Sequence, residues 1–311
     1  MSVYTPLSAE QLNDALHPYG LTLEQHRAAS HGIENSTFLI DARDSGGRPR
    51  ALVMTLFEQL SAEQLHPYLA LLLALDSQQL PVPAPLTHDG RQPLITVAGK
   101  PAIVMPRLPG HHEFSVDAEQ CQQIGGWLAR LHACDCQSLP ALPTERQRLA
   151  QLAGQLPALP EHERALATAL LARWQAIPAG HTLIHGDLFR DNVLWQDGRI
   201  SALLDFYNAC LDCPEYDLAV TLNDWCVDPD SGQPMPERQQ ALLSGYRQQG
   251  GRHDPERLSL ALAVAALRFW LSRLAGPVSS HSEGQGSKDP EEFARIFRQR
   301  IEALQQATGA D

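Results

Sequence analysis

The first part of the chain alternates between helical and extended patterns of hydrophobic residues. Apolar residues recur at helical spacing over 8–19, after a capping box in which Ser8 is the N-cap and Gln11 lies three residues on. Gly20 is a natural stop for this helix. The apolar run at 50–57 predicts a strand. This region therefore combines at least one helix with sheet structure.

A second helix and two short strands follow in the same region. A helix is predicted over 61–79, and the proline-rich segment that starts at Pro81 ends it firmly. Two strands are predicted at 94–97 and 102–105, and the turn between them contains Lys100. We expect these strands to belong to the same small sheet as the earlier one.

From about residue 110 onward the hydrophobic pattern is mostly helical, apart from the stretch 181–209. The segment 278–289 is polar and rich in serine and glycine, which indicates a surface loop. Helices are predicted at 117–134, 215–225, 237–248, 254–275 and 290–307, with two more inside 144–177 that break near Pro157 and Pro160.

The stretch 181–209 contains three short apolar strands with polar residues at their ends. Leu183 and Ile184 run into His185-Gly186-Asp187, and Leu203 and Leu204 run into Asp205. Between them, Val193-Leu194-Trp195 turns at Asp197-Gly198, which is a strong hairpin signal. The stretch thus places polar side chains at strand ends, where a folded sheet presents them to a ligand.

These polar residues have the types and spacing that phosphoryl transfer from a nucleotide requires. Asp187 follows a strand and can accept the proton of a substrate hydroxyl, while Asn192 and Asp205 offer oxygen atoms of the kind that Mg²⁺ prefers. His185 and Arg190 are expected to brace the loop. The alternative for any one of these residues is a side chain that only caps the loop.

Two further segments fit the binding of a nucleotide. Gly32, Asn35 and Ser36 form a polar turn whose backbone N–H groups can cover the phosphates of ATP, although an ordinary hairpin turn has the same composition. The segment from Met105 through Arg107 to Gly110 is rich in turn residues and is a plausible hinge, where an adenine ring packs.

Composition narrows the class of protein. The 311 residues are 43% hydrophobic and 19% charged, as in ordinary globular chains, and the net charge of −12 argues against a nucleic-acid partner. We find no run of eighteen apolar residues and no secretory signal, so the expected location is the cytoplasm, away from any membrane. Oligomeric state is not indicated.

Six cysteines are present, and two of them form the motif Cys210-Leu-Asp-Cys213. A structural zinc site needs a second pair of ligands at set spacing, and Cys134-Asp-Cys136 does not match. Free thiols in a reducing compartment are the preferred interpretation, with a metal or disulfide role as the alternative.

The segment from His185 to Asn192, together with Leu204-Asp205-Phe206, resembles the aminoglycoside/choline phosphotransferase-like kinases. The resemblance implies an α+β fold of the bilobal protein-kinase-like type. An N-lobe (1–107) would hold a small antiparallel sheet, and a larger, mainly helical C-lobe (108–311) would hold the catalytic loop. It also implies that Asp187 is the catalytic base and that Asn192 and Asp205 are metal ligands.

Other segments resemble the bacterial homoserine kinases of this superfamily over the whole length of the chain. They include Gly32-Ile-Glu-Asn-Ser-Thr-Phe, Asp205-Phe-Tyr-Asn-Ala-Cys, Tyr216-Asp-Leu-Ala-Val-Thr-Leu-Asn-Asp-Trp-Cys and Arg268-Phe-Trp-Leu-Ser-Arg-Leu. This resemblance implies phosphorylation of the L-homoserine hydroxyl with ATP and Mg²⁺, in threonine biosynthesis. The alternatives are a kinase of the same fold for another amino alcohol, for choline or ethanolamine, or for an aminoglycoside, and a nucleotide-binding regulator without activity.

One departure from the wider superfamily motivates that last alternative. The superfamily has a lysine in the third strand that reaches the nucleotide phosphates, whereas Thr55 stands at the equivalent position here, as it does in the homoserine kinases that the chain resembles. Glu63 resembles the helix glutamate that would pair with that lysine. Lys100 is a candidate for the missing charge, and a solvated hairpin lysine is the alternative.

Homoserine carries an ammonium, a carboxylate and a hydroxyl group, so its site requires groups of both charges. Asn208, Asp224 and Arg268 are candidates for the acceptor site because they flank the catalytic stretch or fall in the narrower motifs. For Arg268 the alternative is an ion pair between helices. Trp225 and Trp270 are expected to belong to the core rather than to a ligand platform.

Overall fold

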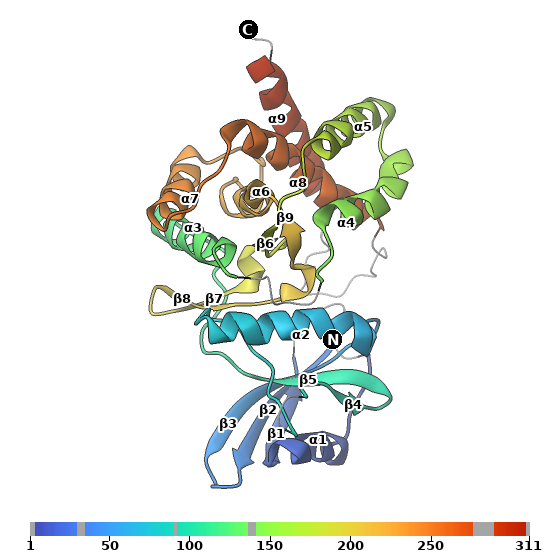
Figure 1. The fold of residues 1–311 in the computed structure, drawn as a ribbon, viewed down its shortest axis with the longest axis vertical. Helices are drawn as coiled ribbons and strands as arrows, with labels where there is room; N and C mark the ends of the chain where they lie inside the picture. The colour runs from blue at the N-terminus through green and yellow to red at the C-terminus, as the bar shows by residue number, and fades with distance from the viewer. Residues whose placement is uncertain (1–3, 30–34, 90–91, 136–140, 276–288, 309–311) are drawn as a thin grey trace. The chain divides into compact units, whose positions relative to one another are not determined.

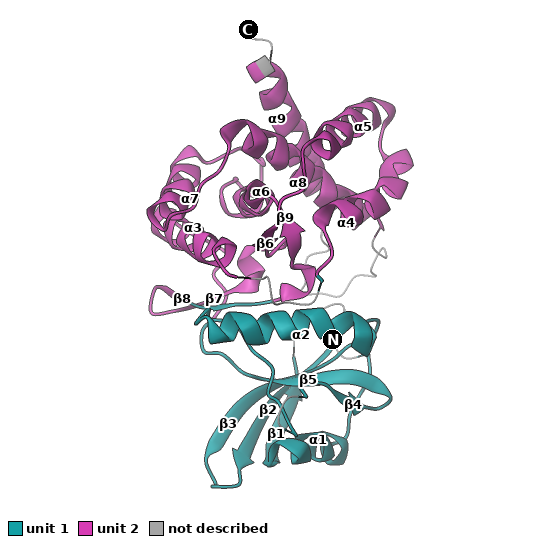
Figure 2. Ribbon diagram, viewed as in Figure 1, with its two compact units in different colours: residues 1–110, 138–141, 201–204 teal, residues 111–137, 142–200, 205–311 magenta. Residues whose placement is uncertain are grey.

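A computed structural model describes residues 4–29, 35–89, 92–135, 141–275 and 289–308. The chain divides into two compact units (Figure 2), which we describe separately. Unit 1 holds the described part of 1–110, with Ala141 and 201–204, and unit 2 holds the remainder. The predicted loop at 278–289 lies almost entirely outside the described residues.

Unit 1 is built on a five-stranded antiparallel sheet with the strand order β1-β2-β3-β5-β4. The fold class predicted for this part, a small antiparallel sheet with helices, is confirmed. The elements are α1 (Ala9–Leu16), the 3₁₀ helix η1 (His17–Tyr19), β1 (Leu21–Ala28), β2 (Ser36–Asp44), β3 (Pro49–Leu56), α2 (Ala62–Ser77), β4 (Ile95–Val97) and β5 (Lys100–Pro106).

The two helices of unit 1 begin where the sequence predicts. Ser8 and Gln11 form the capping box of α1, and Ser61 and Gln64 form that of α2. Gly20 stops the first helical segment with a left-handed backbone, φ 66°. The apolar face of α1 packs on alternate sheet residues such as Leu52, Met54 and Leu56 in one buried cluster, and α2 lies on the other side of the sheet (Figure 1).

Unit 2 is mainly helical (Figure 1), which also agrees with the prediction. The long helices pack around a core to which four aromatic side chains, Trp174, Trp225, Tyr216 and Phe297, contribute as fully buried groups. The helices are α3 (Ala118–His132), α4 (Glu145–Leu152), η2 (Ala153–Ala158), α5 (Glu161–Ala176), α6 (Pro214–Trp225), α7 (Pro236–Gln248), α8 (Pro255–Ala275) and α9 (Pro290–Thr308).

Four short strands cross the region between α5 and α6. Strand β6 (Thr182–Ile184) pairs with β9 (Cys210–Asp212), a strand that the sequence pattern did not indicate. Strands β7 (Val193–Gln196) and β8 (Arg199–Leu203) form the predicted hairpin. Asp197 and Gly198 have φ values of 51° and 72°, as the favoured two-residue hairpin turn requires.

Helix α8 is long and apolar enough, by length and composition, to cross a membrane, and it is the one such helix among the described residues. A helix was predicted at 254–275, but charged residues such as Arg257 and Arg268 interrupt its apolar run, so it contains no eighteen consecutive apolar residues. Within the structure 67% of its most apolar window is buried. It packs against α6 and α9 and is a core helix of unit 2.

Candidate active site

Asp187 lies in the loop that leaves β6, and the backbone of that loop is tightly constrained. Gly186 has φ +74°, and a β-carbon at this position would lie 2.7 Å from the carbonyl oxygen of Asn208. Only glycine meets both conditions without strain. The Asp187 side chain is 17% exposed, so it is accessible to a small ligand while its backbone is held in place.

A buried carboxylate fixes the start of this loop. Asp217 on α6 is fully buried and accepts hydrogen bonds from the backbone N–H groups of His185 and Gly186, both at 2.8 Å. His132 on α3 contacts the same carboxylate at 3.1 Å and is itself bonded to Tyr246. Burial by itself raises the pKa of Asp217, but the hydrogen bond and charge of His132 outweigh it and hold this pKa below its usual value.

His185 contacts the loop from inside the protein. Its side chain is fully buried, its ring packs on Phe206 at a centroid distance of 4.5 Å, and its Nδ1 accepts from the backbone N–H of Asp187 at 3.3 Å. The imidazole therefore helps to hold the backbone of Asp187, the proposed base.

Arg190 secures the far end of the loop, and its partner is Asp224 on α6. The Arg190 backbone N–H and two of its guanidinium nitrogens lie 2.8–3.1 Å from the Asp224 carboxylate. A third guanidinium nitrogen donates to the carbonyl of Phe114. Burial lowers the pKa of Arg190, but the charge of Asp224 more than compensates, so its pKa is raised. Asp224 was predicted near the acceptor; in the structure it holds the loop.

The two residues predicted to bind metal both present oxygen atoms. The Asn192 amide donates through Nδ2 to the carbonyl of Asp187 at 2.7 Å, so its carbonyl oxygen points away from that contact. Asp205 precedes η4 (Phe206–Asn208), is exposed and adopts a left-handed backbone with φ 60° and ψ 60°. An amide oxygen and a carboxylate suit Mg²⁺, so the donor set fits this ion.

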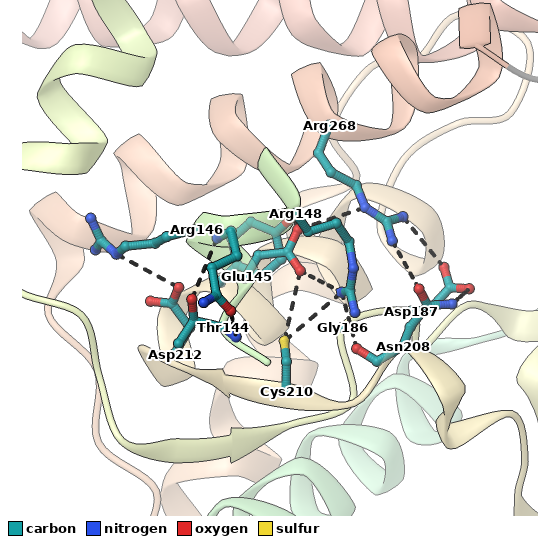
Figure 3. A network of polar contacts seen from close by, with 12 residues as sticks. Thr144, Glu145, Arg146, Arg148, Gly186, Asp187, Asn208, Cys210, Asp212 and Arg268 are labelled. Atoms are coloured by element: carbon teal, nitrogen blue, oxygen red, sulfur yellow. Dashed lines mark hydrogen bonds and ion pairs between the residues drawn. The ribbon is translucent and has the colours of Figure 1, made fainter. Parts of the chain in front are cut away.

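Asn208 and Arg268 converge on Asp187 (Figure 3). Asn208 donates to the Asp187 carboxylate at 3.2 Å, and Arg268 donates to the Asn208 side-chain oxygen at 3.2 Å. Nη1 of Arg268 lies 4.0 Å from the nearer Asp187 oxygen. Arg268 comes from α8, and its side chain is only 7% exposed. The structure thus places two of the three acceptor candidates beside the proposed base.

An acidic residue at the start of α4, Glu145, lies next to Arg268 (Figure 3). Its side chain is fully buried and pairs with Nε of Arg268 at 3.7 Å. It also accepts hydrogen bonds from Arg148 and from the hydroxyl of Tyr216, the latter at 2.8 Å. The sequence analysis missed Glu145 and Arg148, because nothing in the capping box at Thr144 and Gln147 distinguishes this helix from any other.

The structure describes two of the three residues predicted to cover the nucleotide phosphates with their backbone N–H groups. Gly32 lies outside the described residues. The Ser36 side chain is fully buried, and its hydroxyl accepts from the backbone N–H groups of Tyr4 and Thr5 and donates to Glu58. Asn35 accepts from the backbone N–H of Glu58 at 3.3 Å. Both side chains are therefore engaged within unit 1.

Lys100 is neither a solvated hairpin residue nor a substitute for the missing strand lysine. It begins β5 and forms an ion pair with Glu58 and a 2.8 Å hydrogen bond with Thr5. Lys100 lies on the same face of the sheet as Ala102, which packs with α1, whereas Thr55 pairs with Ile103 on the opposite face. The lysine thus fastens the segment before α1 to the sheet.

The same alternation places Met105 on the face of Thr55, because Met105 pairs with Val53. Met105, at the predicted adenine segment, and Thr55, at the position of the missing lysine, therefore share one face of the sheet. Arg107 just beyond β5 bonds to Asp41 through its guanidinium and to Ala51 through its backbone. Glu63 lies exposed in the first turn of α2 and has the position of a capping acid.

The tryptophans belong to the core, as predicted. Trp225 is fully buried, and its indole N–H donates to the carbonyl of Leu188 at 2.9 Å, which adds another support to the catalytic loop. Trp270 packs against Phe297 at a centroid distance of 5.6 Å. Cys210 is buried beside Glu145, and burial followed by the charge of Glu145 raises its pKa, so it is a thiol at neutral pH.

The chain is similar to known proteins over most of its length. Residues 25–260 match the model of the phosphotransferase enzyme family. A homoserine kinase of Pseudomonas aeruginosa (strain LESB58) is 39% identical over 312 residues, which cover 96% of each chain. A homoserine kinase of Cupriavidus taiwanensis is 35% identical, with 97% of this chain and 96% of that one covered.

Among solved structures, a thermostable mutant of the aminoglycoside phosphotransferase APH(4)-Ia, in a ternary complex with AMP-PNP and hygromycin B, superposes with a TM-score of 0.66. The match has 18% sequence identity and covers 94% of this chain and 98% of that one. At this identity it shows the fold alone. The predicted α+β kinase-like architecture is confirmed by this likeness.

Proposed function

The chain belongs to the phosphotransferase enzyme family, with full-length relatives that are homoserine kinases, and from this premise we propose that it transfers the γ-phosphoryl group of ATP to the hydroxyl of L-homoserine. One observation supports this most directly. Asp187 stands at a strand end on a backbone held at both ends, with polar partners from α8 and η4 converging on its carboxylate.

In the proposed reaction Asp187 accepts a hydrogen bond from the homoserine hydroxyl and orients that oxygen for in-line attack on the γ-phosphorus. The hydroxyl proton passes to the carboxylate as the new P–O bond forms and the bond to ADP breaks. Asp217 and Asp224 keep the loop that carries Asp187 at fixed positions. The base is thus positioned before the substrate arrives, which lowers the entropic cost of the reaction.

Asn192 and Asp205 are the residues that would hold Mg²⁺, and their donor set fits it. When bound, the ion neutralises charge on the phosphate oxygens. We propose that the adenine and phosphates lie along the sheet face of unit 1 that carries Thr55 and Met105. The side chains of Ser36 and Arg107 already bind other groups of unit 1. At these two positions we therefore propose that backbone groups contact the nucleotide.

We further propose that the product, O-phosphohomoserine, enters threonine biosynthesis and that the enzyme works in the cytoplasm. The acidic net charge of −12 does not select among acceptors, because cationic substrates would also suit it. Choline, ethanolamine and aminoglycosides are therefore the competitors to exclude.

The test is ADP release by the purified full-length protein with Mg²⁺, ATP and each acceptor in turn. We expect turnover with L-homoserine and at least about 100-fold lower kcat/KM with choline, ethanolamine and kanamycin, because a site built to hydrogen-bond the polar groups of its own substrate discriminates strongly against ligands that lack them. The absence of homoserine-dependent ADP release would contradict the proposal. Release with one of the other acceptors instead would assign the protein to a different kinase of this fold.

A further inference from the structure

Asn208 is held at three points, more firmly than a turn residue needs. Arg148 donates to its backbone carbonyl at 3.1 Å, and Gly186 approaches the same carbonyl so closely that no β-carbon fits between them. Arg268 donates to its side-chain oxygen at 3.2 Å. The remaining group of Asn208, its side-chain NH₂, faces the carboxylate of Asp187.

These contacts decide which way the amide of Asn208 points. A guanidinium group can only donate hydrogen bonds, so the oxygen of the amide must face Arg268. The NH₂ group then has to face Asp187, where it donates to one carboxylate oxygen at 3.2 Å. The other carboxylate oxygen faces Nη1 of Arg268 at 4.0 Å, which is too long for a hydrogen bond. The amide of Asn208 therefore restricts the rotation of the carboxylate by holding one of its oxygens.

Both arginines depend on Glu145. One oxygen of its carboxylate accepts from Arg148, and the other lies 3.7 Å from Nε of Arg268 and accepts from Tyr216. Glu145 is fully buried, and Nε of Arg268 is buried with no hydrogen-bond partner. A buried carboxylate between two arginines is retained only where its geometry is well defined. Figure 3 shows this continuous chain of contacts from α4 to Asp187.

We propose that Glu145, Arg148, Arg268 and Asn208 form a positioning relay for Asp187, in which Glu145 holds the two arginines, the arginines hold Asn208, and Asn208 sets the rotation of the catalytic carboxylate. Asn208 touches Asp187 directly, whereas Glu145 and Arg148 act through it. This inference rests on the proposed function only in taking Asp187 as the base. It assigns Arg268 to positioning rather than to the carboxylate of the acceptor.

The structure offers a matched control for the relay. Arg146 and Arg148 both lie on α4, with side chains 15% and 19% exposed, and each pairs with a fully buried carboxylate. Arg148 reaches Asn208, whereas Arg146 contacts Asp212 and the carbonyl of Trp174. Arg146→Gln and Arg148→Gln each remove an arginine of the same helix from a buried carboxylate, at 3.7 Å and 2.5 Å respectively, and only the second disturbs the relay.

The experiment measures kcat and KM for homoserine, together with the unfolding midpoint, in wild type and in Asn208→Ala, Arg148→Gln, Arg146→Gln and the double variant Asn208→Ala/Arg148→Gln. We expect kcat to fall about 100-fold in Asn208→Ala and about tenfold in Arg148→Gln, with less than about threefold change in KM. Arg146→Gln should keep kcat within about twofold of wild type, even if its unfolding midpoint falls as far as that of Arg148→Gln.

The double variant provides the sharpest comparison. If Arg148 acts through Asn208, its replacement has no further effect once Asn208 is gone, so the double variant should be within about twofold of Asn208→Ala. Independent losses that multiply, or an equal loss of kcat in Arg146→Gln, would overturn the relay. Arg268→Gln tests the rival assignment: a large rise in KM for homoserine with kcat retained would identify Arg268 as the acceptor-carboxylate ligand instead.

A failure of the proposed function is distinguishable from a failure of the relay. If the wild type does not phosphorylate homoserine, the same variants are compared with whichever acceptor it does use. The relay predicts the same order of kcat losses with that acceptor, since the contacts to Asp187 do not involve the substrate. An order that changes with the acceptor would contradict the relay.

Discussion

At the scale of single residues, the site depends on contacts that leave little freedom. Gly186 is the clearest case, because both its positive φ and the nearby Asn208 carbonyl exclude a side chain. Gly198 in the β7–β8 turn has almost the same φ, 72°, but a β-carbon added there would meet nothing within 4 Å. A substitution at Gly198 therefore tests backbone strain alone, whereas one at Gly186 tests backbone strain together with a steric clash.

We predict that Gly198→Ala costs about 1 kcal/mol of unfolding free energy, through the left-handed backbone alone. Gly186→Ala should cost at least about 2 kcal/mol and lower kcat at least about tenfold, because the added methyl group must push the catalytic loop away from Asn208. Chemical denaturation and steady-state kinetics measure both quantities. Equal destabilisation by the two substitutions, with full activity in Gly186→Ala, would refute the importance of this contact.

Asp217 gives a prediction about pH. Its pKa in the folded protein lies below the usual value, so between the two values the unfolded chain binds more protons than the folded one. Its contribution to stability is therefore present above about pH 4, near the unfolded pKa of an aspartate, and is lost as the pH falls further.

Replacing Asp217 by Asn should cost about 3 kcal/mol at pH 7, because the buried carboxylate that contacts His132 is lost and one oxygen must serve two backbone donors. The stability of the variant should also fall less steeply than that of wild type as the pH is lowered below about 5. Unfolding curves measured as a function of pH would test this, and an unchanged acid slope would contradict it.

At the scale of elements, α6 organises the catalytic loop. Asp217 and Asp224 are seven residues apart, so they lie on the same face of the helix, and they bind opposite ends of the loop. Trp225 adds a bond to Leu188 between them. Helix α6 is thus the template on which the loop that carries Asp187 is fixed.

This arrangement predicts the effect of Asp224→Asn. Because Asp224 acts on the loop through Arg190, the variant should lower kcat about tenfold and leave KM for homoserine within about threefold. A direct acceptor contact, as its sequence position first suggested, would instead raise KM with kcat retained. Steady-state kinetics with varied homoserine distinguishes the two.

The sequence was most informative where the residues of the site lie close together along the chain. One short stretch of sequence contains all the residues of the motif, so it could be recognised and each residue given a predicted role: His185, Asp187, Arg190, Asn192 and Asp205. Glu145, Arg148 and Asp217 could not be placed in the same way, because they reach the loop from helices whose packing no local pattern specifies.

The sequence also could not determine the pairing register of the strands in the sheet of unit 1. Lys100 was assigned to a turn, and its possible contact with a nucleotide depended on which face of the sheet it occupies. The pairing of β3 with β5 decides that face, and a shift of one residue would reverse it. The sequence pattern located β3, β4 and β5 to within two residues, which is not accurate enough to choose a face, and it gave no bounds for β1 and β2.

At the scale of the whole molecule, binding of the nucleotide should be visible as a change in stability. A ligand that binds only the folded state stabilises it by about 2.7 kcal/mol at 100 times its dissociation constant. We therefore expect Mg²⁺ and ATP together to raise the unfolding midpoint and EDTA to reduce this rise. Asn192→Ala and Asp205→Ala should lose most of the Mg²⁺-dependent part. A rise that EDTA and both substitutions leave unchanged would contradict the assigned metal ligands.

The most direct test of the account is the turnover number of Asp187→Asn with saturating ATP, Mg²⁺ and L-homoserine. Asparagine keeps the size of the side chain but cannot accept the hydroxyl proton as a carboxylate does. We predict that kcat falls at least about 1000-fold, with the unfolding midpoint and the KM for ATP close to those of wild type. A variant that folds normally and keeps more than about a tenth of wild-type turnover would contradict the central claim that Asp187 is the catalytic base.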